Sequence, residues 1–431
     1  MLQLLRSHRD FSWAQLLCRQ ISVWRNCAIG EVRLAALARS ANRKRLRART
    51  VMSCIFVPSS WRTSPSSFVA KRPRGFPSYC GPMDICCSHA TGLQLLRWWS
   101  RKNPFTLERF HGLVPNSEQD ILPLQHMSFS ASRAVARTER ELAWALEGID
   151  DSALREELAA LLAGSGPAPC HVLVPSCSGQ HCTQRVVFHQ VPRTLPEGSL
   201  VELIPGVLCA SPELVFVQMA EVLGLGGLVA LGYELCGGYP LDGRIPQVRS
   251  PLTTPLRLAA FARQVERLHG LRLARVAVRF VQAKSASAME TEVSALATMS
   301  VKWGGFGLPP ARLNERINLS SAAARVARSS ALVLDAYWPA ANIALEYDGR
   351  ESHGSEWGRI RDSRRRDALA VEGINLVTLT AEQFAVHQEF EEVIALIRRR
   401  LGMRPARKSR GFPEAHSGLR YQLRRFHQER Y

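Results

Sequence analysis

The pattern of apolar and polar residues over positions 83–270 changes from a helical period to a strand period and back. Apolar residues recur every three or four positions over 91–100 and 138–163, which predicts helices there. Gly and Asp residues at 148–151 interrupt the second segment, so we expect a pair of helices with an Asp capping the second. Short β-branched runs over 170–210 predict a small sheet.

A helix start and a glycine-rich turn follow this sheet. Ser211 and Pro212 are typical of an N-cap and of the first turn of a helix, which continues through ELVFVQMAEVL. The LGLGG segment at 223–227 superficially resembles a nucleotide loop. Because it comes after a helix and not after a strand, we interpret it as a turn between two helices and not as a phosphate-binding loop.

A second run of elements begins near Val281. The segment AKSASAMETEVSALATMS predicts a helix with an apolar stripe formed by Ala288, Val293, Leu296 and Ala297. A loop rich in glycine and proline, WGGFGLPP, leads to RINLS, which predicts a first strand. Two acidic strand patterns follow, ALVLDAYWP and NIALEYDG, and after them come a basic helix and the apolar strand NLVTLT.

Each acidic strand pattern carries a carboxylate among apolar neighbours. Strict alternation places Leu334 and Ala336 on one face of the first strand and Asp335 on the other. The turn at 339–342 favours a hairpin, in which Asp335 and Glu346 converge on one face at the end of the sheet. Buried carboxylates are costly unless they bind a cation or a partner, so these two are candidate ligands of Mg²⁺ or Mn²⁺.

Charge is distributed unevenly along the 431 residues, whose net charge is +19. Residues 1–82 hold 15 Lys and Arg against 2 acidic residues, and residues 401–431 hold 8 against 2. The region between them, 83–400, holds 33 of each and is neutral. The high isoelectric point is therefore a property of the two ends. We interpret 401–431 as a basic tail, and a disordered end is one reading of it.

The first 82 residues differ from the rest of the chain. An Arg-rich run at 41–50, Pro and Ser clusters after Pro58, and the absence of a sustained polar-apolar period predict a basic, disordered segment. A nucleic-acid-binding arm and a targeting presequence are two interpretations. We favour a third, that the natural chain starts at Met83 and the preceding stretch is translated upstream sequence, because helical periodicity begins there and the charge excess stops.

The sequence contains no run of 18 or more apolar residues, so we expect a cytoplasmic protein without a transmembrane helix. Its 11 cysteines lie at irregular positions, which favours reduced thiols over a disulfide scaffold. A zinc site could be drawn from four residues: Cys170, Cys177, His181 and Cys182. They include no Cys-x-x-Cys pair, and the adjacent His181 and Cys182 would point apart on a strand, so we do not expect zinc there.

The order of elements over 83–270 resembles the AbiEi-like antitoxin or regulator segment found in front of nuclease-like domains in many bacterial proteins. The resemblance rests on HVLVPS, on the basic strand ending in His189, and on PGVLCASPELVFVQMA and LGYELCGGY. It implies a mixed α+β regulatory or DNA-binding region, with a toxin or another protein as a further partner. The neutral charge argues against the DNA part, because phosphate binding needs a local surplus of Lys and Arg.

The acidic strands and their surroundings resemble the PD-(D/E)xK nuclease superfamily, and more closely the very-short-patch-repair-like endonuclease domains of bacteria. The resemblance covers residues 281–400. It rests on an ordered set: Glu290 on a leading helix, Asp335, Glu346-Tyr347-Asp348-Gly349, His353, Asp362, Arg365, Leu369 and Gly373. It implies an α/β chain whose C-terminal domain is a restriction-endonuclease-like α/β/α fold.

The resemblance also implies a role for each acidic residue. Asp335 and Glu346 would bind Mg²⁺ or Mn²⁺. Glu290 would assist directly or through a water molecule, and Asp348 would be an additional ligand or lie next to the ligands. Asp348 stands where the superfamily has a lysine, which departs from the pattern. Very-short-patch-repair-like members use histidine, so His353 is the expected substitute in proton transfer.

The helix after the acidic strands is basic. Arg364, Arg365 and Arg366 are expected to contact DNA phosphates, with Leu369 packed inward on the same helix. A solvated face or an Asp362–Arg365 ion pair is the alternative. Two functions remain. One is a Mg²⁺-dependent DNA endonuclease or nickase in DNA repair or phage defence; the other is a non-catalytic DNA-binding or antitoxin-like transcriptional regulator that retains the nuclease fold.

Overall fold

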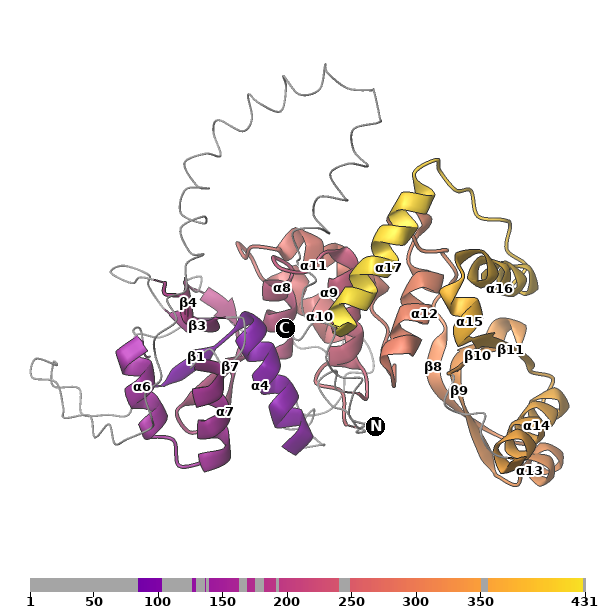
Figure 1. The fold of residues 1–431 in the computed structure, drawn as a ribbon, viewed down its shortest axis with the longest axis horizontal. Helices are drawn as coiled ribbons and strands as arrows, with labels where there is room; N and C mark the ends of the chain where they lie inside the picture. Colours follow the sequence, from indigo (N-terminus) through magenta and orange to yellow (C-terminus); the bar gives the residue numbers. More distant parts are fainter. Residues whose placement is uncertain are drawn as a thin grey trace, which may run out of the picture. The chain divides into compact units, whose positions relative to one another are not determined.

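The computed structural model of the 431-residue chain describes residues 84–102, 126–128, 136, 139–162, 169–174, 182–190, 194–239, 249–349 and 356–428. The chain divides into two units, Met1–Ser78 and Tyr79–Tyr431. All of the described residues belong to the second unit (Figure 1). The expectations for residues 1–82, including the disorder and the start at Met83, lie outside the described residues.

The first sheet of the second unit has five strands in the order β4-β3-β1-β7-β6. The strands are β1 (Ile85–Cys87), β3 (Cys170–Val174), β4 (Val186–Gln190), β6 (Leu200–Ile204) and β7 (Val207–Ala210). β1 pairs in parallel with β7 and β3 with β4, whereas β1 with β3 and β6 with β7 are antiparallel. A separate pairing joins β2 (His126–Ser128) to β5 (Thr194–Pro196). The predicted small sheet is confirmed, but its central strand comes from the segment just after Met83, where the pattern predicts only helical periodicity.

Two of the helices in this part of the chain begin where the sequence predicts a cap. The helices are α4 (His89–Lys102), α6 (Glu139–Glu147), α7 (Ser152–Leu162), α8 (Pro212–Met219), α9 (Leu225–Cys236), α10 (Pro255–Gln264) and α11 (Leu271–Ala277), followed by the short η3 (Val278–Phe280). The Asp151 carboxylate accepts a hydrogen bond from the Leu154 amide at 2.9 Å, and the Ser211 hydroxyl accepts one from the Leu214 amide at 3.2 Å. Both are N-cap contacts, so the predicted helix pair and the predicted start of α8 are confirmed.

The glycine-rich turn between α8 and α9 lies against α17 (Phe412–Gln428). The Gly226 amide donates to Oε1 of Gln422 at 2.8 Å, and a Cβ at Gly226 would lie 2.9 Å from Cβ of Gln422. Glycine is needed here because another helix approaches the backbone closely. The prediction of a helix-helix turn is confirmed. The reading of 401–431 as a disordered end is wrong, because the apolar face of α17 is buried in the core.

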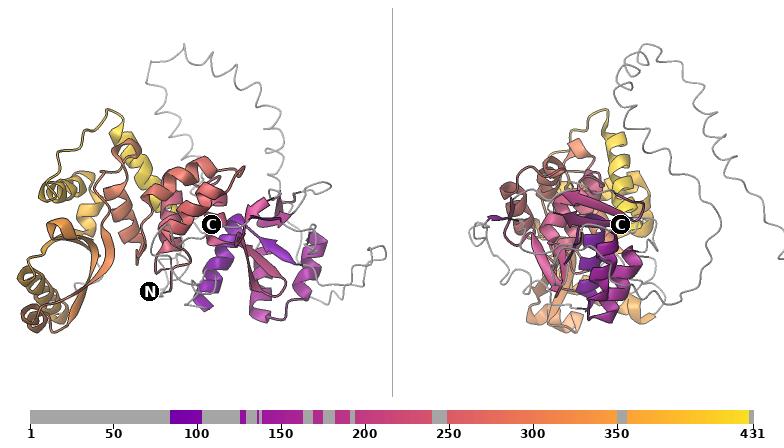
Figure 2. Two further views of the ribbon diagram at one scale, coloured as in Figure 1. Left: turned by 180° about the vertical axis from the view of Figure 1, so that it is seen from behind. Right: turned by 90° about the vertical axis from the view of Figure 1, so that its left-hand side faces the viewer.

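The second sheet has four strands in the order β11-β10-β9-β8. Along the chain its elements are α12 (Ala288–Thr298), η4 (Val301–Trp303), β8 (Arg312–Asn318), α13 (Ser321–Ala327), β9 (Ala331–Trp338), η5 (Pro339–Ala341), β10 (Ile343–Asp348), α14 (Glu356–Val371), β11 (Asn375–Thr380), α15 (Ala381–Ala385) and α16 (His387–Arg400). β8, β9 and β10 form an antiparallel meander, and β11 pairs in parallel with β10 after α14 (Figures 1 and 2). The described residues therefore form a mixed α/β structure, as predicted.

The two faces of the second sheet pack against different helices. Leu345 and Val377 belong to the main core, to which α12 and α16 also contribute. Ala344 packs on the other face in a smaller cluster with Leu369 of α14. The predicted inward orientation of Leu369 is confirmed, since its side chain is fully buried.

The alternation of β9 breaks at Asp335. Leu334 packs in the smaller cluster, whereas Ala336 belongs to the main core. The pairing of β8 with β9 skips Asn314 and Asp335, and Asn314 has a φ of +44°. The prediction that Leu334 and Ala336 share one face is therefore wrong. Local irregularities of this kind re-aim a side chain, and this one brings Asp335 to the side of the sheet on which α12 packs.

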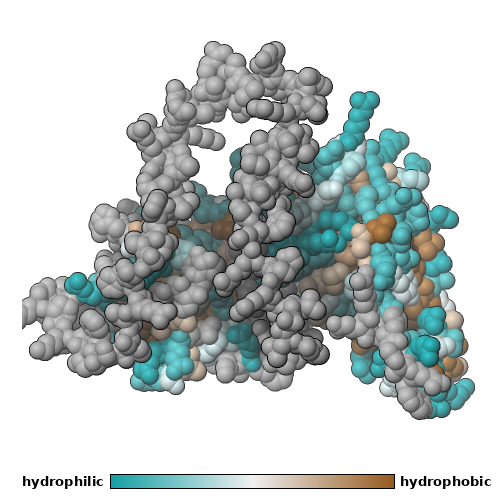
Figure 3. Space-filling model, viewed as in Figure 1, coloured by the Kyte–Doolittle hydropathy of each residue, from teal (hydrophilic) through white to brown (hydrophobic). Residues whose placement is uncertain are grey.

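The described helices differ from membrane-spanning helices. None of those within the described ranges is both long enough and apolar enough to cross a bilayer. On the face shown in Figure 3, hydrophilic residues make up most of the coloured surface.

Candidate functional site

Glu290, Asp335 and Glu346 come from three elements, and Asp335 interacts electrostatically with each of the other two. Glu290 is in the first turn of α12, Asp335 is in β9 and Glu346 is in β10. Glu290 and Asp335 line one pocket, together with apolar side chains such as Leu345 and Trp338. Asp335 therefore shares the pocket on the α12 side with Glu290. Glu346 is on the same face of β10 as Ala344, which packs toward α14, and it pairs with Arg365 of that helix. The predicted convergence of Asp335 and Glu346 on one face is not confirmed.

Glu290 is oriented by hydrogen bonds at the start of α12. Its carboxylate accepts from the Ser287 hydroxyl and from the Ala286 amide, each at 2.9 Å. Nδ2 of Asn314 also donates to it, at 2.6 Å. Asn314 has a left-handed backbone where the β8–β9 ladder skips the pair opposite Asp335, and its side-chain amide donates to Glu290 from this position.

Asp335 is a buried carboxyl group with a raised pKa. Burial raises the pKa of Asp335 to about 7, and the nearby carboxylates of Glu290 and Glu346 add to the rise. The Tyr347 amide, which donates to Oδ2 at 3.0 Å, and the Arg365 guanidinium lower the pKa without cancelling the effect. At neutral pH the surrounding protein therefore disfavours the ionised form of Asp335.

Glu346 is paired with a cation from α14. Nε of Arg365 donates to Oε1 of Glu346 at 2.9 Å, and Nη2 donates to the same oxygen and to the Val333 carbonyl. The alternative of an Asp362–Arg365 pair is wrong, because Asp362 is instead 4.0 Å from Nε of Arg361. Arg365 therefore contacts the acidic cluster, and its predicted contact with DNA stays a prediction.

The remaining predicted site residues are Asp348, His353, Arg364 and Arg366, and the structure describes all of them except His353. Asp348 ends β10 half-buried and is paired with Thr380 of β11 in the ladder. His353, the expected substitute for the superfamily lysine, lies outside the described residues. Arg364 is half-buried and Arg366 exposed on α14, and their contacts with DNA stay predictions.

The donor chemistry of the acidic cluster fits Mg²⁺ or Mn²⁺, since both prefer carboxylate oxygens and water. The carboxylate oxygens of the acidic cluster are farther apart than the ligand atoms of a complete metal site. Over the residues that the structure describes, one group of three His, Cys, Asp or Glu has all its ligand atoms within 4.8 Å, and that group consists of histidines. Mg²⁺ commonly uses only one or two protein carboxylates and keeps several waters, so Asp335 and Glu346 suffice as protein ligands.

Two features of this site escaped the sequence-based reasoning. Asn314 sits in RLNERIN without any acidic or catalytic signature, and its only signal is that asparagine tolerates a positive φ better than most residues. The partner of Arg365 lies 19 residues away in Glu346, and no local pattern indicates that contact. The compact histidine group was also missed, because its members are spread over the front region.

The four residues weighed as zinc ligands are distributed differently. Cys170 is buried in β3, where burial raises the pKa of its thiol to about 12, and Cys182 is exposed. Cys177 and His181 lie outside the described residues. A thiol must lose its proton to bind zinc, so the raised pKa of Cys170 disfavours it as a ligand.

Comparison of the chain with protein-family models, with curated proteins and with solved structures finds no match. Neither the resemblance to the AbiEi-like segment nor that to the PD-(D/E)xK superfamily gains support from these comparisons. What the protein does is therefore inferred from its own residues and their geometry.

Proposed function

We propose that the protein is a Mg²⁺- or Mn²⁺-dependent DNA endonuclease or nickase, with a restriction-endonuclease-like catalytic region at 281–400. The order of elements supports this proposal. A leading helix, three antiparallel strands, a helix and a parallel strand are what the resemblance to very-short-patch-repair-like endonucleases implies. A role in bacterial DNA repair or phage defence, in the cytoplasm, belongs to the same proposal.

The raised pKa of Asp335 is the observation that carries the proposal. Burial and two acidic neighbours put the pKa of this carboxyl group at about 7, so the protein bears a cost for placing it there. Groups with such perturbed pKa values concentrate at functional sites. A divalent cation held between Asp335 and Glu346 compensates the clustered negative charge, as the pairing of opposite charges does in other buried sites.

The roles of the side chains follow from this arrangement. When bound, Mg²⁺ lowers the pKa of a water ligand and neutralises charge on the phosphate. Asp335 and Glu346 hold the ion, and Glu290, fixed by its hydrogen bonds, orients a water molecule or binds directly. Asp348 is an additional acidic group at the end of β10, and His353 moves the proton from the attacking water.

The helix α14 supplies positive charge beside the acids. It carries five arginines against three acidic residues. Arg364 and Arg366 contact DNA phosphates, a sequence-independent interaction that positions the substrate. Arg365 pairs with Glu346. Its release frees the carboxylate for the cation and the guanidinium for a phosphate.

The Glu346–Arg365 ion pair also favours a second function. The Arg365 guanidinium neutralises Glu346, so a stable pair leaves Asp335 as the only one of the two proposed ligands that can bind a metal ion. In that case the protein is a non-catalytic DNA-binding or antitoxin-like transcriptional regulator. The region 83–270 then binds a toxin or another protein, and the nuclease fold serves only as a DNA-binding surface.

A plasmid-nicking assay with the full chain distinguishes the two. Supercoiled DNA is incubated with Mg²⁺ or Mn²⁺ and with wild-type protein, Glu346→Ala or Glu315→Ala. Glu315 is the matched control, since it lies on the same sheet but pairs with Arg312 at 3.3 Å. We expect Glu346→Ala to lose about 100-fold or more of the nicking rate and Glu315→Ala to keep it.

Two results would contradict the enzyme. Equal rates for wild-type and Glu346→Ala protein would show that the cluster is not the active site. Folded wild-type protein that binds DNA but nicks it with neither metal would favour the regulator.

A further inference from the structure

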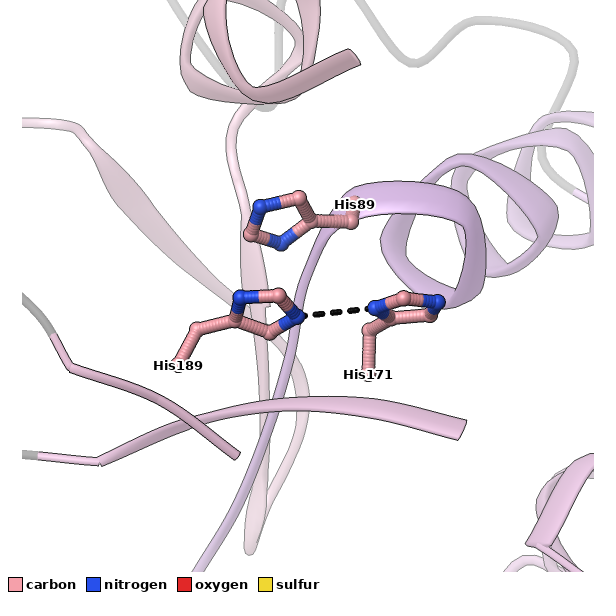
Figure 4. Close-up of side chains that lie close together, drawn as sticks. All are labelled: His89, His171 and His189. Carbon is pink, nitrogen blue, oxygen red and sulfur yellow. Dashed lines mark hydrogen bonds between the residues drawn. The ribbon is translucent and has the colours of Figure 1, made fainter. Parts of the chain in front are cut away.

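Three histidines from distant parts of the front region meet in space. His89 begins α4, His171 is in β3 and His189 is in β4. One ring nitrogen from each lies within 4.8 Å of the other two. In Figure 4 the ring of His89 lies over that of His189, and His171 faces His189 from the neighbouring strand.

The two strand histidines form a fixed pair. β3 and β4 run in parallel, and His189 is opposite Leu173, so His171 and His189 point to the same face of the sheet. Nδ1 of His171 and Nε2 of His189 are 2.8 Å apart. The His171 amide donates to the Thr91 hydroxyl at 2.8 Å, which ties this strand to α4.

His89 is held over that pair by an unusual backbone. Its φ is +49°, an uncommon value for a residue other than glycine. Its amide donates to Oε1 of the buried Gln218 at 3.1 Å, and the Ser88 hydroxyl lies 3.0 Å from its Nδ1. The ring centroids of His89 and His189 are 3.7 Å apart. Backbone strain that neighbouring contacts maintain is typical of sites where a side chain has to be aimed.

His89 is buried, and His171 and His189 are half-buried. Burial lowers the pKa of His89 to about 2 and that of His189 to about 4, and it also lowers the pKa of His171. A neutral imidazole presents a lone pair on one ring nitrogen, which is the form that binds metal ions. The ordinary alternative is a stacked, hydrogen-bonded histidine group with no ligand.

We propose that His89, His171 and His189 bind one Zn²⁺ ion, at a site separate from the acidic cluster. Zinc–imidazole distances of about 2.0–2.1 Å require ligand nitrogens only slightly farther apart than the His171–His189 contact already is. The ion replaces that contact, and the His89 ring has to turn out of its stack on His189 to direct a nitrogen at the ion. Three protein ligands leave a fourth position for water or an exogenous ligand. The Ser88 hydroxyl beside Nδ1 of His89 fixes its ring in the manner of outer-shell partners at other metal sites.

Zinc is favoured over the cation of the acidic cluster by ligand type. Imidazole suits Zn²⁺ and related d-block ions, whereas Mg²⁺ prefers oxygen ligands. The protein is thus expected to separate the two metals by chemistry, with zinc at the front region and Mg²⁺ or Mn²⁺ at Asp335 and Glu346. The zinc proposal does not depend on nuclease activity.

The test measures zinc on the full chain after removal of metals with a chelator. Elemental analysis after reloading gives the stoichiometry, and titration calorimetry gives the affinity. Variants His171→Gln and His189→Gln are compared with His269→Gln, whose side chain is 93% exposed at the surface. We expect one more equivalent of tightly bound zinc in wild-type and His269→Gln protein than in the other two. We also expect about 100-fold or more weaker zinc binding when either ligand is lost.

Two further measurements keep the outcome decisive. Co²⁺ in place of zinc gives intense visible absorption only when it is four- or five-coordinate, so this band should be absent from His171→Gln and His189→Gln. The same titration on Glu346→Ala protein shows whether any zinc is bound at the acidic cluster. The proposal would be overturned if folded His171→Gln and His189→Gln proteins bound as much zinc as wild-type protein. The same comparison is made with each histidine variant combined with Glu346→Ala, and equal zinc content there would overturn it too.

Discussion

Replacing Asp335 with asparagine is expected to stabilise the protein at pH 8 when divalent metals are removed. The substitution keeps the size of the side chain and an oxygen that can accept the Tyr347 amide, which donates to Asp335 at 3.0 Å. It removes the charge that burial and the nearby carboxylates of Glu290 and Glu346 make unfavourable. Sites built for function commonly reduce stability in this way.

The magnitude follows from the pKa. Folding raises the pKa of Asp335 from 3.8 to about 7. Each pKa unit corresponds to about 1.4 kcal/mol, so the full cost at pH 8 is at most about 4 kcal/mol, and solvent relaxation reduces it to about 2–4 kcal/mol. Because the folded pKa is above the unfolded one, the cost is absent below about pH 4, grows as the pH rises, and is complete above about pH 7.

Urea denaturation of wild-type and Asp335→Asn protein in EDTA, at pH 4.5 and pH 8, measures this effect. We expect the variant to be more stable at pH 8, and its advantage to shrink by about 2–3 kcal/mol at pH 4.5. Adding Mg²⁺ at about 100 times its dissociation constant should stabilise wild-type protein by about 3 kcal/mol and the variant by much less. A pH-independent difference, or a variant less stable than wild type at pH 8, would refute the reasoning about Asp335.

Two further predictions concern stability. Gly304 has a φ of +89°, and a Cβ there would lie 2.3 Å from the Ala415 carbonyl oxygen of α17, so Gly304→Ala should lose more than about 3 kcal/mol. Gly373→Ala, with a φ of +71° and open space around its Cβ, should lose only about 1 kcal/mol. Thermal denaturation of the two glycine variants measures both losses, and equal losses would show that α17 does not pack against Gly304. Arg97 makes a buried bidentate ion pair with Glu234 at 2.8 Å, so Arg97→Met should lose about 3–5 kcal/mol and regain much of it in combination with Glu234→Leu. A double variant no more stable than Arg97→Met would contradict the assumption that the loss comes from the charge of Glu234 once Arg97 is removed.

Much of the local structure can be predicted from the sequence because its causes lie within a few residues. The Ser211 cap and the cap after the break before α7 depend on contacts three positions apart. The hairpin that joins β9 to β10 is likewise local, and it brings Asp335 and Glu346 to neighbouring strands. The candidate acids were found for this reason, since strand-forming residues around a carboxylate are visible in the sequence itself.

Alternation along a strand was a poorer guide. It fails at Asp335, where Asn314 of the partner strand adopts a left-handed backbone and the ladder skips one pair. The sequence shows an asparagine in that strand but does not show which residue of the next strand will be opposite it. The orientation of Asp335 toward α12 therefore depends on the pairing of two strands and not on the sequence of one.

The sequence alone determined several of the helices, the two acidic strands and the residues that carry charge, because these follow from short-range propensity and the period of apolar residues. Only the tertiary structure decided which of those residues meet. The pairing of Arg365 with Glu346, the docking of α17 and the group of His89, His171 and His189 join positions from 19 to about 200 residues apart. Such contacts depend on how all the buried faces pack at once, and a single segment contains no record of that packing.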